Sequence, residues 1–153
     1  MAGLGEQATQ QIVINAAPQA CFDVAVAFER YPEWAGDIKE AVVTERDGAG
    51  RPTLVRFRAA AFGRSTAYTL RYDYAGAPDR LSWVEVEGDI TNRLDGAYEF
   101  VPVDGGQATR VTYHLEADLR FPLPSFVKRR AAVMITHTAL HDLKARVEGT
   151  RST

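Results

Sequence analysis

Residues 108–149 read ATRVTYHLEADLRFPLPSFVKRRAAVMITHTALHDLKARVEG. Apolar and polar side chains alternate from Val111 to Leu119, which is typical of a strand with one buried face. The prolines of segment 121–124 end this strand, and a helical pattern then runs without interruption from Ser125 to about Glu148. Gly149 suits the position just past a helix end. The stretch therefore predicts a last strand followed by one long C-terminal helix.

On a helical wheel, one stripe of the long helix carries most of its larger side chains. The stripe consists of Phe126, Val133, His137, Leu140 and Val147, with Met134 and Leu143 on its flanks. We expect this stripe to face the sheet.

The residues before this stretch have a β-rich pattern after a short helical start. Ile12–Ile14 ends a first strand, Pro18 begins a helix that reaches about Phe28, and a second helical turn is expected at Pro32–Gly36. From there to Leu119, turns rich in Gly, Asp and Pro recur about once per dozen residues. Two of the strands alternate clearly, with these apolar positions: Val55, Phe57 and Ala59, then Tyr68, Leu70, Tyr72 and Tyr74. We predict an α+β fold in which a curved antiparallel sheet of about seven strands wraps around the long helix, with a short helix pair after strand 1.

Length and charge indicate a single domain without a nucleic-acid partner. The 153 residues suit one domain over residues 7–149, with frayed ends at 1–6 and 150–153. With 18 basic and 20 acidic side chains, no nucleic-acid partner is expected, and Lys128–Arg130 is interpreted as a solvated helix face. No leader pattern and no transmembrane segment is recognisable, so a cytoplasmic protein is expected.

Few residues suggest metal binding or nucleophilic catalysis. His137 and His141 have a metal-ligand spacing, but His114 falls on the polar face of its strand, and no cysteine or carboxylate completes the pair. We therefore expect neither a metal nor a cofactor. Cys21, the single cysteine, lies among apolar neighbours of the first helix, where a thiol behaves as a small hydrophobic group.

The strand around Trp83 can be oriented in two ways. Its two faces are Leu81, Trp83 and Glu85 on one side, and Ser82, Val84 and Val86 on the other. If Trp83 faces inward, so does Glu85, and a buried carboxylate needs a partner or a raised pKa. The reverse orientation leaves no buried, unpaired carboxylate but exposes the Trp83 side chain. The sequence leaves this register open.

Several segments resemble a known family. They are Phe28–Trp34, Leu81–Trp83, Leu94–Tyr98, Ala108–Tyr113 and Pro122–Arg130. Together they resemble the polyketide cyclase/dehydrase and lipid-transport family of the START-like (SRPBCC) superfamily. The resemblance implies the helix-grip (START/Bet v 1-like) fold, with a cavity for an apolar molecule between the sheet and the C-terminal helix. It implies no single activity, because the superfamily includes aromatase/cyclases, lipid carriers, ligand-sensing receptors and proteins that bind other proteins.

Aromatic side chains and one helical histidine are the candidate ligand contacts. The expected ligand-binding residues are Trp34, Phe57, Tyr72, Trp83, Tyr98, Tyr113, Met134 and His137. Tyr98 and His137 are also the candidate catalytic residues, because each could donate a proton. The structural alternative is that the aromatics form the core and that His137 is hydrogen-bonded structure.

Three functions are consistent with these residues. The favoured hypothesis is a binder or carrier of a lipid, isoprenoid or polyketide-like molecule. A cyclase, aromatase or dehydratase is the alternative, although Arg56, Arg58 and Arg71 alternate onto the outer face, away from any cavity chemistry. A protein-interaction module that uses Lys128–Arg130 and the sheet edges is the third.

Overall fold

The computed structural model describes residues 6–61, 63–120 and 122–149, which form one sheet, two α-helices and two short 3-10 helices. In chain order the elements are β1 (Glu6–Ile14), α1 (Pro18–Ala25), η1 (Phe28–Glu33), β2 (Ile38–Arg46), β3 (Pro52–Ala61), β4 (Arg64–Asp73), β5 (Arg80–Gly88), β6 (Thr91–Val103), η2 (Asp104–Gly106), β7 (Ala108–Leu119) and α2 (Ser125–Gly149).

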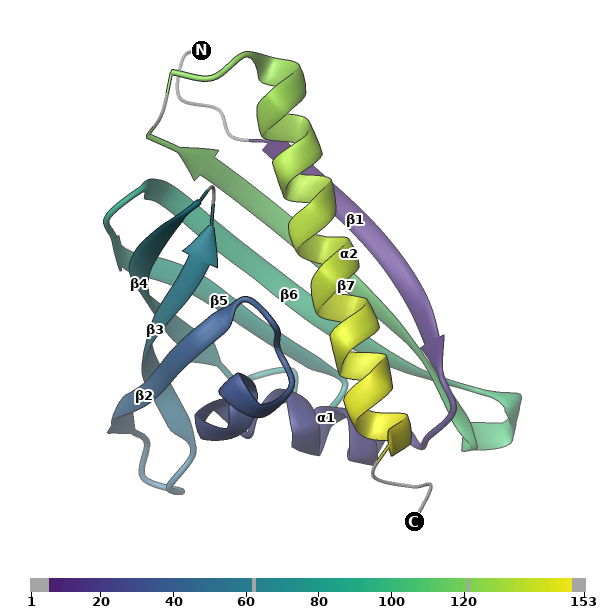
Figure 1. The fold of residues 1–153 in the computed structure, drawn as a ribbon. Helices are drawn as coiled ribbons and strands as arrows, with labels where there is room; N and C mark the ends of the chain where they lie inside the picture. The colour runs from purple at the N-terminus through teal and green to yellow at the C-terminus, as the bar shows by residue number, and fades with distance from the viewer. Residues whose placement is uncertain (1–5, 62, 121, 150–153) are drawn as a thin grey trace.

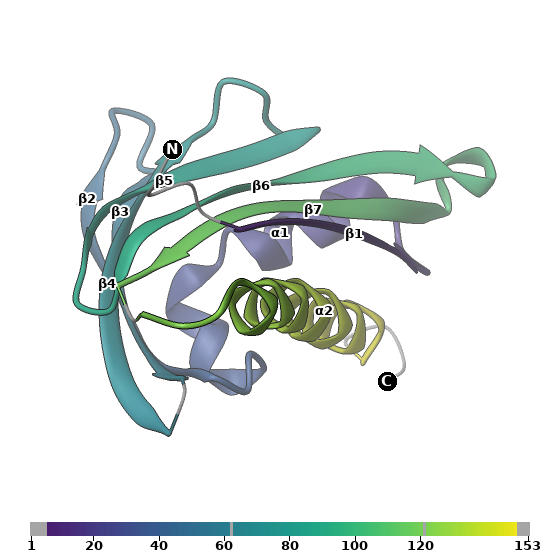
Figure 2. The ribbon, with the colours of Figure 1, turned by 90° about the horizontal axis from the view of Figure 1, so that it is seen from above.

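The seven strands form a single antiparallel sheet in the order β1-β7-β6-β5-β4-β3-β2 (Figure 1). Strands β2 to β7 follow one another as a meander, and β1 adds to the free edge of β7. The sheet curves, and α2 crosses its concave side (Figure 2). The predicted α+β helix-grip architecture, with a helix pair after strand 1, is confirmed.

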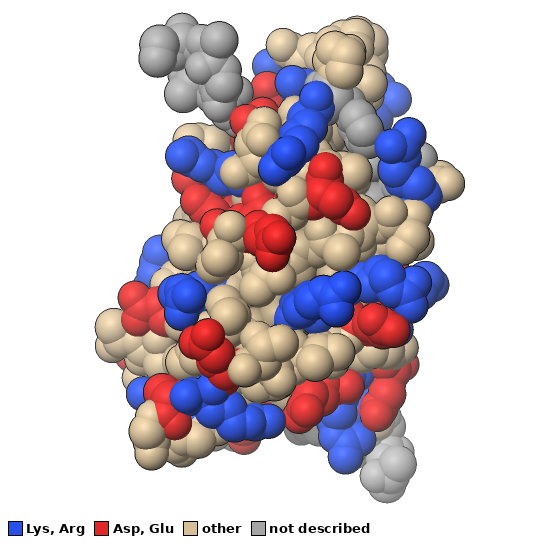
Figure 3. Space-filling view, turned by 90° about the vertical axis from the view of Figure 1, so that its left-hand side faces the viewer, with Lys and Arg blue, Asp and Glu red and all other residues tan. Residues whose placement is uncertain are grey.

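Alternation along the strands separates an apolar concave face from a charged convex face. Val55, Phe57, Leu70 and Tyr72 are buried, as the period of two predicted. On the convex face Arg58 pairs with Glu40 (3.2 Å) and Arg71 pairs with Glu45 (3.8 Å). Figure 3 shows basic and acidic side chains interspersed over the left-hand side of Figure 1. Exposed pairs of this kind stabilise a fold by about 1 kcal/mol or less each.

The buried face of α2 differs from the predicted stripe. Its buried residues are Ala132, Thr136, Leu140, Leu143 and Val147. The prediction is right for Leu140 and Val147 but wrong for Phe126, Val133 and His137, which are exposed. Small side chains at Ala132 and Thr136 let the helix approach the sheet closely, and this rotates the larger residues outward.

Hydrogen bonds to β1 fix α2 in this orientation. The Gln10 Nε2 donates to the Val133 carbonyl (2.8 Å) and to the Thr136 hydroxyl (2.7 Å), and the Lys144 Nζ donates to the Val13 carbonyl (2.8 Å). The helix therefore rests on the β1–β7 edge of the sheet and leaves space on the β3–β4 side.

Element boundaries agree with the prediction to within a few residues. The first helix ends at Ala25, and the second helical turn is the 3-10 helix η1. The expected fraying at 1–5 and 150–153 lies outside the described residues, whereas Glu6 already belongs to β1 and Gly149 to α2. None of the described helices is both long and apolar enough to cross a membrane.

Candidate ligand-binding cavity

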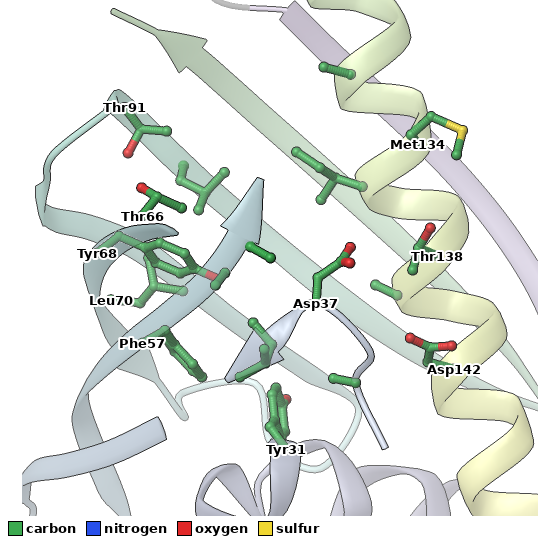
Figure 4. Close-up of a pocket in the computed structure, with 18 of the residues that line it drawn as sticks. Tyr31, Asp37, Phe57, Thr66, Tyr68, Leu70, Thr91, Met134, Thr138 and Asp142 are labelled. Carbon is green, nitrogen blue, oxygen red and sulfur yellow. The ribbon is translucent and has the colours of Figure 1, made fainter. Parts of the chain in front are cut away.

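A cavity of about 560 Å³ lies between the concave face of the sheet and α2 (Figure 4). Phe57, Tyr68 and Leu70 of β3 and β4 form one wall, and Trp83, Tyr98 and Tyr113 of β5 to β7 form the base. Tyr31 and Trp34 close the end near η1. The volume falls within the range of about 300–1,000 Å³ that small-molecule sites usually have.

The third side of the cavity is a second face of α2. Its lining residues are Val127, Arg130, Ala131, Met134, Ile135, Thr138, Ala139 and Asp142. They recur every three or four residues and so share one side of the helix. This face lies next to the buried face that packs on the sheet. One helix thus carries a packing face and a cavity face side by side.

The base of the cavity is a cluster of packed aromatic rings around Trp83. The Trp83 ring centroid lies 5.7 Å from that of Tyr72, 5.4 Å from Tyr98 and 5.6 Å from Tyr113. Gly96 is the cross-strand neighbour of Trp83, and the indole lies over it. Because the chain has two tryptophans and both line the cavity, its intrinsic fluorescence reports directly on this space.

Four phenol groups bring hydrogen-bonding capacity into the apolar cavity. Within the described ranges, the hydroxyls of Tyr68, Tyr72, Tyr98 and Tyr113 have no hydrogen-bond partner, whereas the Tyr31 hydroxyl donates to the Ala25 carbonyl (2.5 Å). Burial raises the pKa of all five phenols well above the usual value. At neutral pH all five phenols are therefore neutral, and the four without a partner can donate a hydrogen bond to a bound molecule.

The structure selects one of the two registers for β5. Trp83 is 6% exposed, whereas Val84 and Val86 are 51% and 52% exposed, so Trp83 and Glu85 share the concave side. The Glu85 Oε2 accepts a hydrogen bond from the Thr91 hydroxyl, and its Oε1 is buried without a partner among the described residues. Burial raises the pKa of the Glu85 carboxyl, and the Thr91 hydrogen bond offsets part of this effect.

Two further carboxylates lie at the edge of the cavity. Asp37 precedes β2, and Asp142 projects from α2 one turn after Thr138 (Figure 4). The Asp142 Oδ2 accepts a hydrogen bond from the Gly36 backbone N–H (3.1 Å). Neither carboxylate was predicted as a site residue from the sequence. Asp142 follows Met134 and Thr138 in steps of four residues, and this spacing on one helix face is the signal that could have placed Asp142 in the cavity.

Most of the predicted contact residues lie in the cavity wall. These are Trp34, Phe57, Tyr72, Trp83, Tyr98, Tyr113 and Met134. His137 does not line the cavity, contrary to the prediction, because the packing face of α2 centres on Thr136 and turns the imidazole to solvent. There its ring stacks near that of His141, with centroids 4.0 Å apart.

The other reactive side chains have structural environments. His114 lies on the outer face, as predicted, with its Nε2 3.1 Å from the Glu99 Oε1 and its Nδ1 3.2 Å from the Thr9 hydroxyl. Cys21 is buried, and burial raises the pKa of its thiol. No group of three metal-ligating side chains occurs in the parts of the chain that the structure describes.

Residues 6–148 match the family model described as polyketide cyclase/dehydrase and lipid transport. The chain belongs to this family. The match covers nearly all of the described chain and includes every residue of the cavity wall named above. Comparison with curated proteins gives no match.

Solved structures of this family's fold superpose closely on the chain. A START superfamily protein from Mycobacterium smegmatis aligns with a TM-score of 0.90 at 22% identity, covering 95% of this chain and 99% of that one. The Zhui aromatase/cyclase from a Streptomyces species aligns with a TM-score of 0.80 at 15% identity, covering 94% and 93%. A STAR-related lipid transfer protein from Xanthomonas axonopodis aligns with a TM-score of 0.73 at 17% identity, covering 97% and 89%. At these identities the likeness establishes the fold.

Proposed function

We propose that this member of the family binds an apolar small molecule in the cavity and releases it unchanged, as a binder or carrier. The observation that carries the proposal is the 560 Å³ cavity itself, which is walled mainly by aromatic and aliphatic side chains. Burying apolar ligand surface there would contribute roughly 25 cal/mol per Å². The free phenols of Tyr72, Tyr98 and Tyr113 would orient one polar group of the ligand.

The first test is native mass spectrometry of protein purified from its own host, followed by denaturing spectra of the same sample. We expect a discrete mass that is present under native conditions and lost on unfolding. Titration with 1-dodecanol, read by the fluorescence of Trp34 and Trp83, tests the same cavity with a defined probe. A protein that carries no ligand and gives no response to dodecanol would contradict the proposal.

A pair of matched variants localises the binding. Ala131 lines the cavity from α2, whereas Ala145 lies on the exposed side of the same helix and is not part of the wall. Ala131→Phe should fill part of the cavity and weaken dodecanol binding at least tenfold. Ala145→Phe adds the same side chain and should leave binding unchanged. Equal binding by both variants would place the ligand elsewhere.

A second candidate function is cyclisation or dehydration of a polyketide-like chain. The three tyrosine rings packed around Trp83, whose hydroxyls have no partner among the described residues, favour it, because such reactions need a positioned proton donor. Tyr98 is the donor that we would test, whereas His137 lies outside the cavity. Under this alternative, Tyr98→Phe abolishes turnover of a poly-β-ketone substrate and retains binding. Unchanged turnover in that variant would remove Tyr98 from the mechanism.

A further inference from the structure

Asp37 and Asp142 form a carboxylate pair at the edge of the cavity between the segment before β2 and α2. Figure 4 shows both side chains directed toward this gap, with Thr138 one helical turn from Asp142. The hydrogen bond from the Gly36 N–H uses the Oδ2 of Asp142. Within the described ranges neither carboxylate takes part in an ion pair.

Basic side chains near this pair form no ion pair with it among the described residues. Lys39 reaches the same edge, but its Nζ donates to the Gly36 carbonyl (3.2 Å). Arg130 is the one cation among the described lining residues, and it precedes Asp142 by twelve positions, which is about 18 Å along a helix axis. Among the described lining residues, the acidic ones are Asp37 and Asp142 at one edge and the one basic group, Arg130, lies far along the helix, while Lys39 lies next to the acidic edge without being part of the lining.

The field of these carboxylates extends into the cavity. Burial is the largest cause of the raised pKa of Tyr68 and of Tyr98. The charges of Asp37 and Glu85 add to the shift at Tyr68, and the charge of Asp142 adds to the shift at Tyr98. A negative charge on a bound molecule would be repelled by these same carboxylates.

We propose that the cavity selects apolar molecules with a cationic end, such as an alkylammonium group held between Asp37 and Asp142, and discriminates against carboxylate-ended ones. The inference rests on the proposed binding function and specifies the ligand class. The apolar chain lies against the aromatic base, and the ammonium group lies at the acidic edge. Aromatic faces near that edge, such as those of Tyr31 and Trp34, add attraction for a cation.

The test compares three probes with the same chain: dodecylamine, 1-dodecanol and dodecanoate at pH 7, titrated at low micromolar concentrations and read by tryptophan fluorescence. We expect dodecylamine to bind most tightly and dodecanoate most weakly. One exposed charge pair at about 4 Å changes affinity about fivefold, so two carboxylates predict a ratio of at least tenfold between amine and carboxylate. The ratio should fall as salt is added, because the edge is open to solvent.

Two double variants with the same change in net charge localise the effect. Asp37→Asn/Asp142→Asn should bring the amine-to-carboxylate ratio down toward one, and the amide oxygen introduced at position 142 can still accept from the Gly36 N–H. Asp23→Asn/Asp104→Asn removes two exposed carboxylates that do not line the cavity and should keep the wild-type ratio. The uncharged dodecanol reports whether each variant still binds an apolar chain.

The outcomes separate this inference from the function on which it rests. If dodecanol binds and the wild type shows no preference for the amine, the charge inference fails while the binding function stands. If dodecanoate binds best and Arg130→Gln removes that preference, the selectivity is the opposite of the one proposed and comes from Arg130. If none of the three probes binds, both proposals fail.

Discussion

Substituting Gly96 should displace Trp83, because no room exists between this glycine and the indole. A Cβ atom at position 96 would lie 2.6 Å from the Trp83 Cζ2 and 2.7 Å from the His114 carbonyl oxygen. Non-bonded carbon atoms are most stable at about 3.5–4.0 Å, so one group must move by about 1 Å. Tyr72, Tyr98 and Tyr113 surround the ring, and the remaining free direction is into the cavity. Overpacking of this kind costs about 1–3 kcal/mol.

Gly96→Ala should therefore lower the free energy of unfolding by about 1–3 kcal/mol, which corresponds to a melting temperature lower by about 2–12 °C for a chain of this size. Urea unfolding followed by circular dichroism measures the loss, and tryptophan fluorescence measures the weaker binding of dodecanol. Gly48→Ala is the matched control, because a Cβ there meets no atom within 4 Å. If the two variants have the same stability and bind dodecanol equally, the indole is not confined as described.

Three further predictions concern ionisable groups. The raised pKa of Glu85 means that this carboxyl stabilises the fold when protonated and loses that contribution as pH rises through its folded-state pKa. Glu85→Gln should therefore be more stable than wild type at pH 7, with a gain that shrinks as pH falls through the raised folded-state pKa and levels off below the ordinary value of a glutamate carboxyl, and a gain independent of pH in urea unfolding would refute this. His137→Ala should bind dodecanol as wild type does, because the side chain is exposed and outside the cavity wall. Cys21 is fully buried and burial raises its pKa, so a thiol reagent at pH 8 should react with it only on the timescale of unfolding, and rapid labelling of native protein would contradict its placement.

Sequence predicted the sheet well because a period of two is a strong signal. The alternating positions of β3, β4 and β7, such as Phe57, Tyr72 and Tyr113, all face inward as expected. The register of β5 was open because the pattern sets Trp83 and Glu85 on the same face, and burying an acid is costly. The Thr91 hydroxyl, six residues later and across a turn, compensates part of that cost. A partner of this kind cannot be read from alternation.

The existence of the long helix could be predicted from the sequence, but the side of it that faces the sheet could not. Its buried face includes Ala132 and Thr136, which add little to an apolar stripe, whereas the exposed Phe126 adds much. Close approach to β1 depends on the small size of these side chains and on the hydrogen bonds of Gln10, neither of which a helical wheel represents. Asp142 was missed because the orientation of the helix, and with it the cavity face, was not known. A single acid on a long charged helix has no pattern of its own until the cavity face is known.

The two faces of α2 separate the residues that pack the helix on the sheet from those that line the cavity. Leu140, Leu143 and Val147 hold the helix on the sheet, and truncating Leu140 or Leu143 to alanine should cost about 2–5 kcal/mol. Residues of the cavity face, such as Ala131 and Thr138, line the cavity instead of packing in the core, so their replacement changes the shape and charge of the site at little cost to the fold. Because the packing face already fixes the helix, such replacements need not move it. Under the proposed binding function, ligand choice would therefore depend on a few side chains of α2 together with Asp37 before β2, while the aromatic base would supply affinity that is common to any apolar chain.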